Sequence, residues 1–270
     1  MKPLNTRSIW VNLRLFSVLI LLSGCAAQWH KSVGEEGARY AFQFQRNNTA
    51  PTSGVVMIDE AQLAPGDILF SADQGLASRT LRFSGNTSVS HSFVYLGEGK
   101  IAEALGSGVR IMPIQNSMAD SPLLAVYRYP GLTDVQVTAI QAFAEQHLGS
   151  PYNYFGIAKQ TPYTITRKIC ELPVIPRAMR HLCLNTMAVV QVSPFQGNRY
   201  FCSQFVVEAF NRAGAPLTKT PPEWVSPGDL LHMRADDIPS VIPVKPLQYV
   251  GHLRCQTSLW QGSCTLADAS

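Results

Sequence analysis

Apolar and polar positions follow two patterns along the chain, one typical of strands and one of helices. Short apolar runs bounded by Gly, Pro, Asn or Asp predict strands at 68–70, 89–96, 101–105, 109–112, 123–129 and 247–253. Apolar residues at helical spacing predict helices at 76–83, 133–148 and 202–213, and a short helix begins near 226. This order of elements predicts an α+β domain in which a small antiparallel sheet packs on helices.

The helix predicted at 202–213 begins at a cysteine. Its apolar stripe consists of Phe205, Val206, Ala209, Phe210 and Ala213, and Gly214 follows as a C-terminal cap. Cys202 therefore lies in or just before the first turn, where unpaired N–H groups and the helix dipole favour a thiolate. At this point Cys202 can still be a buried small residue, half of a disulfide or a nucleophile.

Residues 1–24 have the pattern of a signal peptide. Three basic residues and no acidic one accompany the apolar run LFSVLILL at 15–22, which is too short to span a bilayer. The segment ends in Leu22-Ser23-Gly24-Cys25, which resembles the lipobox of bacterial lipoproteins, where the cysteine is lipidated and becomes the new N-terminus. An ordinary secretory signal is the alternative. Ala26 follows Cys25, and by resemblance this favours the outer membrane, with the body facing the periplasm.

Charge and composition set the remaining boundaries. Without residues 1–24 the chain has 19 basic and 18 acidic residues, which argues against an electrostatic nucleic-acid binder. We expect residues 25–57 to form the lipidated N-terminus and a tether with room for one helix. Residues 58–254 then form the domain, with an insertion at about 157–198, and 255–270 form a C-terminal tail.

The six cysteines sort by spacing. Cys170 and Cys183 flank twelve residues, and Cys255 and Cys264 flank eight, so an oxidising compartment predicts two local disulfides. With Cys25 assigned to lipid, Cys202 has no partner and is a candidate reactive thiol. No CxxC or HxxxH spacing occurs, so the sequence predicts neither a metal site nor a cofactor.

A cysteine nucleophile needs a histidine as its base. The six histidines are His30, His91, His147, His181, His232 and His252. His91 begins a predicted strand, and Glu103 lies on the next one. A three-residue loop at 97–99, with Gly99 left-handed, pairs Phe93 with Glu103 and places His91 and Glu103 on one face. A two-residue turn would instead place Glu103 on the face opposite to His91. The alternative role for Glu103 is that of a solvated residue on the open face of the sheet.

Four short motifs resemble, in order, the permuted papain-fold amidases of the NlpC-like superfamily, in the YaeF/YiiX group. They are PGDILF at 65–70, SHSFVYLG at 90–97, AEA at 102–104 and YFCSQFV at 200–206. The resemblance extends over nearly all of the chain after Cys25. It implies Cys202 as nucleophile, His91 as base and Glu103 as the group that orients His91. It also implies that Tyr152 lines the site or supports the oxyanion.

The same resemblance implies a reaction. A Cys202 thiolate attacks an amide carbonyl, and water resolves the thioester. Cell-wall peptides are the expected substrate, with membrane attachment through Cys25 and no nucleic-acid partner. The alternatives are a lipid or acyl-ester hydrolase or acyltransferase on the same triad, and a non-catalytic envelope-binding lipoprotein.

Overall fold

The computed structural model describes residues 27–34, 37–72, 87–154 and 199–255, together with 156, 158, 170, 179, 182 and 183. Within 27–44 it describes the backbone strands alone. The helix predicted at 76–83, nearly all of the insertion at 157–198 and the tail after Cys255 lie outside the described residues.

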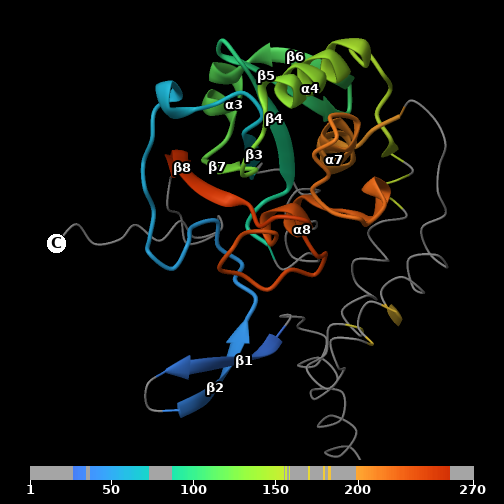
Figure 1. Ribbon diagram of the computed structural model, residues 1–270. Helices are drawn as coiled ribbons and strands as arrows, with labels where there is room; N and C mark the ends of the chain where they lie inside the picture. The colour runs from blue at the N-terminus through green and yellow to red at the C-terminus, as the bar shows by residue number, and fades with distance from the viewer. Residues whose placement is uncertain are drawn as a thin grey trace, which may run out of the picture.

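A six-stranded antiparallel sheet forms the centre of the domain (Figure 1). Its strands are β3 (Ile68–Ser71), β4 (His91–Gly97), β5 (Lys100–Leu105), β6 (Gly108–Pro113), β7 (Leu123–Arg128) and β8 (Gln248–Cys255). They are ordered β6-β5-β4-β3-β7-β8 across the sheet. All six predicted strands are present, with ends shifted by one or two residues. The predicted fold class, α+β with a small antiparallel sheet, is confirmed.

Helices pack on this sheet. They are α3 (Ile114–Asp120), α4 (Asp134–Gln146), α7 (Cys202–Arg212) and α8 (Pro227–Leu231), with the short 3₁₀ turns η1 (Glu60–Gln62) and η3 (Pro222–Trp224). Helix α7 packs against β4, β5 and α4. No helix in the described part of the chain is long and apolar enough to cross a membrane.

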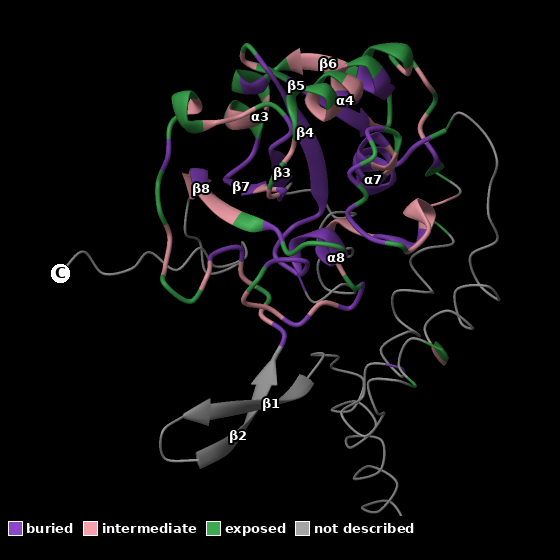
Figure 2. Cartoon of the chain, viewed as in Figure 1, coloured by how far each residue is buried: buried purple, intermediate pink, exposed green. Residues whose placement is uncertain are grey.

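The apolar stripe read from the sequence explains the position of α7. Phe205, Val206, Ala209 and Phe210 are all fully buried, in one core cluster with Val94 of β4. Figure 2 shows that β4 is buried throughout its length and that α7 is buried over most of its own. His91 at the start of β4 and Cys202 at the start of α7 are therefore held in place by elements of the packed core.

The segment before the domain differs from the expected tether. Strands β1 (Ala27–Gly34) and β2 (Gly37–Phe44) pair as a separate two-stranded antiparallel sheet, which projects from the body (Figure 1). This hairpin stands where the sequence analysis allowed for one helix. The body also begins earlier than Ile58, because Thr49 and Ala50 are already fully buried in it.

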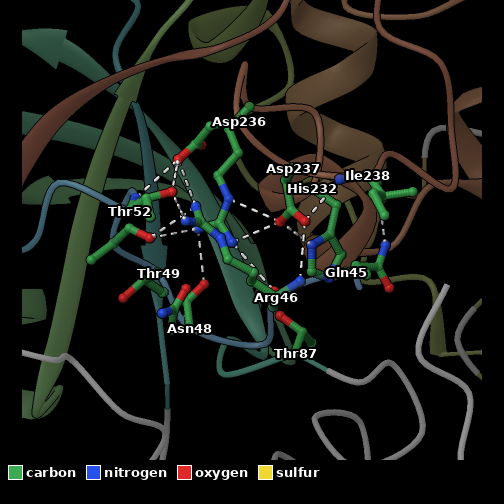
Figure 3. Close-up of polar contacts among 12 residues, drawn as sticks. Gln45, Arg46, Asn48, Thr49, Thr52, Thr87, His232, Asp236, Asp237 and Ile238 are labelled. Atoms are coloured by element: carbon green, nitrogen blue, oxygen red, sulfur yellow. Dashed lines mark hydrogen bonds and ion pairs between the residues drawn. The ribbon is translucent and has the colours of Figure 1, made fainter. Parts of the chain in front are cut away.

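A cluster of ion pairs, buried at Arg234 and Asp237 and partly exposed at Arg46 and Asp236, fastens residues 45–52 to the body (Figure 3). The Arg46 guanidinium donates to Asp236 at 2.8 Å, and the Arg46 backbone N–H donates to Asp237 at 3.1 Å. The Arg234 guanidinium donates to Asp237 at 2.7 Å and to the Asn48 carbonyl at 2.9 Å. Because Arg234 and Asp237 are shielded from water, these contacts hold the segment in a defined position.

Candidate active site

The turn between β4 and β5 differs in detail from the one predicted. It has two residues, Glu98 and Gly99, because Gly97 pairs with Lys100. Both turn residues are left-handed, with φ values of 52° and 70°, as a tight hairpin turn requires. A bulge at Leu96 then shifts the pairing by one residue. The three-residue loop was therefore wrong in its length.

The bulge nevertheless produces the register that the three-residue loop would have given. Beyond the bulge, Val94 pairs with Ala102. Continued along the strands, this register sets Phe93 opposite Glu103 and makes His91 a diagonal neighbour of Glu103 on the same face. The expected juxtaposition of the imidazole and the carboxylate therefore occurs, by a different local route.

His91 and Glu103 form a buried pair. His91 Nε2 lies 2.6 Å from Glu103 Oε2, and their side chains are 8% and 3% exposed. Arg110 stands opposite Glu103 in the β5–β6 register. Its guanidinium donates to the other carboxylate oxygen, from Nε at 2.9 Å and from a terminal nitrogen at 2.8 Å. The carboxylate is thus held from two sides, by the His91 ring and by the Arg110 guanidinium.

Cys202 is the first residue of α7, as predicted, and it is 5% exposed. Among the described cysteines it is the free thiol. Its thiol lies close enough to His91 to help raise the pKa of that imidazole. Because Nε2 of His91 faces Glu103, Nδ1 is the ring nitrogen left for the thiol. The structure therefore brings Cys202, His91 and Glu103 together in one chain of contacts.

The electrostatics of these contacts favour a charged histidine. Burial lowers the pKa of His91, but hydrogen bonds and charge from Cys202 and Glu103 outweigh this and raise it from 6.5 to about 10. Burial raises the pKa of Glu103, but contacts with His91 and Arg110 outweigh this and lower it.

Tyr152 lies beside this group. It forms a bridge with Tyr200, two residues before Cys202. Burial and then the charge of Cys202 raise the pKa of Tyr152, so its hydroxyl stays protonated and can donate a hydrogen bond. Asn153 ties this segment to α7, since its amide donates to the Gln204 side chain at 3.3 Å. Tyr152 is therefore protonated and belongs to a segment that is tied to the start of α7.

The other histidines within the described residues have separate roles. His147 contacts the Phe143 carbonyl at 2.8 Å at the end of α4. His232 pairs with Asp237, and His252 contacts Thr49, in each case at 2.8 Å. The backbone of His30 is in β1, and His181 lies outside the described residues.

The structure also shows where the predicted disulfide cysteines lie. Cys170 is bonded to Cys183, and Cys255 is disulfide-bonded as well. Cys264 and the predicted lipidation site Cys25 lie outside the described residues. In the described part of the chain, no group of three or more His, Cys, Asp or Glu side chains is placed to hold a metal ion.

Sequence reasoning did not identify Arg110 or the Asn153–Gln204 contact. A signal for Arg110 was present, because Gly106-Ser107 is a turn between two predicted strands. A two-residue turn there places Arg110 opposite Glu103. The Asn153–Gln204 contact joins residues 51 positions apart, and no local pattern indicates it.

Comparison with known proteins identifies the family of the chain. The family model described as "Permuted papain-like amidase enzyme, YaeF/YiiX, C92 family" matches residues 62–163, which include His91 and Glu103. The probable lipoprotein peptidase YaeF of Escherichia coli (strain K12) is 38% identical over 244 residues, covering 87% of this chain and 89% of YaeF. The chain belongs to the permuted papain-like amidase family.

As a member of this family, the protein is a hydrolase of the peptidase and amidase class, as the sequence predicted. A crystal structure described as that of the metalloprotein YiiX from Escherichia coli O157:H7 is also similar, with 16% identity and a TM-score of 0.42. The match covers 70% of this chain and 96% of YiiX.

Proposed function

We propose that this amidase-family protein is a cysteine hydrolase in which Cys202 is the nucleophile, His91 the general base and Glu103 the group that orients His91. The observation that carries the proposal is the buried His91–Glu103 pair, with the Cys202 thiol at the start of α7 close enough to raise the pKa of His91. A thiol, a base and an orienting carboxylate in this order are the components of nucleophilic acyl transfer.

Each residue then has a step. The Cys202 thiol gives its proton to His91, and the thiolate adds to the amide carbonyl carbon. The backbone N–H of Cys202 and the protonated Tyr152 hydroxyl donate to the oxyanion. When the C–N bond breaks, His91 returns the proton to the leaving amine. His91 then takes a proton from water, and the hydroxide adds to the thioester carbonyl. The C–S bond breaks, the carboxylic acid product leaves, and His91 returns its proton to the Cys202 thiolate while Glu103 stays charged.

The cell envelope is the proposed compartment. Residues 1–24 have the pattern of a signal peptide, Cys25 is the proposed lipidation site, and the relative YaeF is described as a lipoprotein peptidase. Residues 25–44 then connect the lipid to the body, residues 45–254 form the catalytic domain with its insertion at about 157–198, and residues 255–270 form the tail. The outer membrane, with the domain facing the periplasm, is the proposed site. Cell-wall peptides are the proposed substrates, because they surround a periplasmic lipoprotein, and their amide bonds are the bonds cleaved.

The test is direct. Purified protein is incubated with muropeptides, and separately with phospholipids and acyl esters, and products are identified by mass spectrometry. We expect amide cleavage of the muropeptides, and loss of all product with Cys202→Ala. Release of fatty acid alone would show that the same triad serves a lipid or ester substrate.

Matched controls separate the site from general damage. His91→Gln is expected to abolish turnover, whereas His147→Gln, at the residue that follows α4, should leave it intact. Cleavage that persists with Cys202→Ala would contradict the proposal. So would turnover by the wild-type protein that survives complete alkylation of Cys202.

A further inference from the structure

The β1–β2 hairpin has two chemically different faces. The register pairs Trp29 with Phe42 and Lys31 with Tyr40. Alternate residues of a strand lie on the same face, and residues paired directly across two strands share that face. One face of the hairpin thus holds Ala27, Trp29, Lys31, Val33, Ala38, Tyr40, Phe42 and Phe44, and Lys31 is the one polar residue among them. The other face holds Gln28, His30, Ser32, Gly34, Gly37, Arg39, Ala41 and Gln43.

In the described part of the chain the hairpin packs chiefly on itself. It projects away from the six-stranded sheet (Figure 1). A two-stranded hairpin alone is marginally stable in water and needs a partner for its apolar face. The residues of that face therefore indicate a surface that is covered in the working protein.

The position of the hairpin in the chain indicates what covers it. Ala27 is two residues after Cys25, the proposed lipidation site. Trp and Tyr are the side chains that gather at the boundary between lipid headgroups and acyl chains. Lys31 and Arg39 are balanced in number by Glu35 and Glu36, so the segment offers little net charge for attraction to anionic lipid.

The residues that follow β2 are hydrogen-bonded to the body of the protein. Gln45 directly follows β2, and its side-chain amide donates to the Ile238 carbonyl at 2.8 Å and to Ser240 at 3.2 Å. Arg46 then joins the ionic cluster of Asp236 and Asp237 (Figure 3). No flexible spacer separates β2 from these contacts, so whatever binds the hairpin also constrains the domain.

We propose that the apolar face of the β1–β2 hairpin lies on the membrane surface that receives the lipid of Cys25. The proposal rests on the lipid anchor proposed above for its location, but not on the chemistry of Cys202. The hairpin binds through apolar and aromatic contacts, and the contacts of Gln45 and Arg46 hold the domain in a restricted orientation above the bilayer.

The experiment uses the mature chain, residues 25–270, with Cys25→Ser so that no lipid is attached. Binding to phosphatidylcholine vesicles is measured by co-sedimentation, with and without phosphatidylglycerol. We expect measurable partitioning that changes little with anionic lipid or salt. The double variant Trp29→Ser/Phe42→Ser should reduce partitioning by at least about tenfold, since each aromatic ring buries a large apolar area. The matched variant Gln28→Ser/Gln43→Ser, on the opposite face, should bind as before.

The outcomes separate the proposals. Vesicle binding that is absent, or unaffected by Trp29→Ser/Phe42→Ser, would overturn the membrane assignment while leaving a lipid on Cys25 possible. Lipidation itself is read from the mass of the protein purified from membranes, and Cys202→Ala should bind vesicles normally. A dimer in vesicle-free solution that Trp29→Ser/Phe42→Ser dissociates would assign the face to a second copy of the chain instead.

Discussion

Replacement of Glu103 by glutamine tests the central claim about the site. Glutamine has nearly the same shape and can still hydrogen-bond His91, but it removes the negative charge that stabilises the imidazolium. Because the Glu103 side chain is 3% exposed, water cannot take over the role of the lost charge. Arg110 also loses its partner, but its side chain is 44% exposed and can be solvated.

The geometry of the His91–Glu103 contact sets the expected size of the effect of Glu103→Gln. His91 Nε2 and Glu103 Oε2 are 2.6 Å apart, a charge-assisted hydrogen bond. Such bonds contribute about 1.5–3 kcal/mol net, and neutral ones about 1 kcal/mol. The difference, about 1–2 kcal/mol, predicts a fall in kcat/KM of about 5- to 30-fold for Glu103→Gln. It also predicts that the pKa of His91 falls by about one unit.

The assay is a pH profile of kcat/KM. Wild-type activity should persist until the pH approaches the raised pKa of His91, about 10, above which the imidazolium can no longer protonate the leaving group. In Glu103→Gln the alkaline limb should move to lower pH. The control is Glu98→Gln in the turn of the same hairpin, whose 85% exposed side chain pairs only with Lys100 in the described contacts.

The pH dependence of the unfolding free energy tests the same pair independently of activity. The folded pKa of His91 is raised, so its contribution is complete below 6.5 and lost as the pH rises toward about 10. The folded pKa of Glu103 is lowered, so its contribution is present above 4.5 and lost as the pH falls through the folded value. Glu103→Gln should therefore destabilise the protein most between these limits. A wild-type rate and pH profile in Glu103→Gln would refute the orienting role.

Further predictions concern the rest of the site and the ionic cluster. Tyr152→Phe should lower kcat by about 100-fold with KM little changed, as loss of an oxyanion donor does, and Tyr154→Phe should not. Equal rates for the two variants would remove Tyr152 from the mechanism. Arg110→Ala should lower kcat/KM only about two- to fivefold, because its ion pair is partly solvated. A loss as large as that of Glu103→Gln would show that Arg110 matters more than its exposure implies. Iodoacetamide should alkylate Cys202 at pH 6 faster than it alkylates a simple thiol, and an equal rate would mean that the thiol is not activated. Asp237→Asn should cost about 3 kcal/mol of unfolding free energy in urea, because it leaves the buried Arg234 guanidinium without its carboxylate, and a change below about 1 kcal/mol would show that the cluster is not structural.

The sequence by itself determined most elements of the central domain and the chemistry of their ends, but not the β1–β2 hairpin or α3. Periodicity and caps predicted β4, β5 and α7, because local sterics and the burial of one apolar face decide these within a few residues. The same patterns placed Cys202 at a helix start and His91 and Glu103 on neighbouring strands. Spacing alone also left Cys202 without a local partner.

Only the tertiary structure decided how these ends meet. The bulge at Leu96 sets the register of Glu103, and it depends on how β4 fits between two neighbouring strands and α7 rather than on the turn residues alone. The contacts of Arg110 follow from that register. The ion pair between Arg46 and Asp236 joins residues 190 positions apart. Contacts between distant segments are selected by packing of the whole core, so no local pattern in the sequence records them.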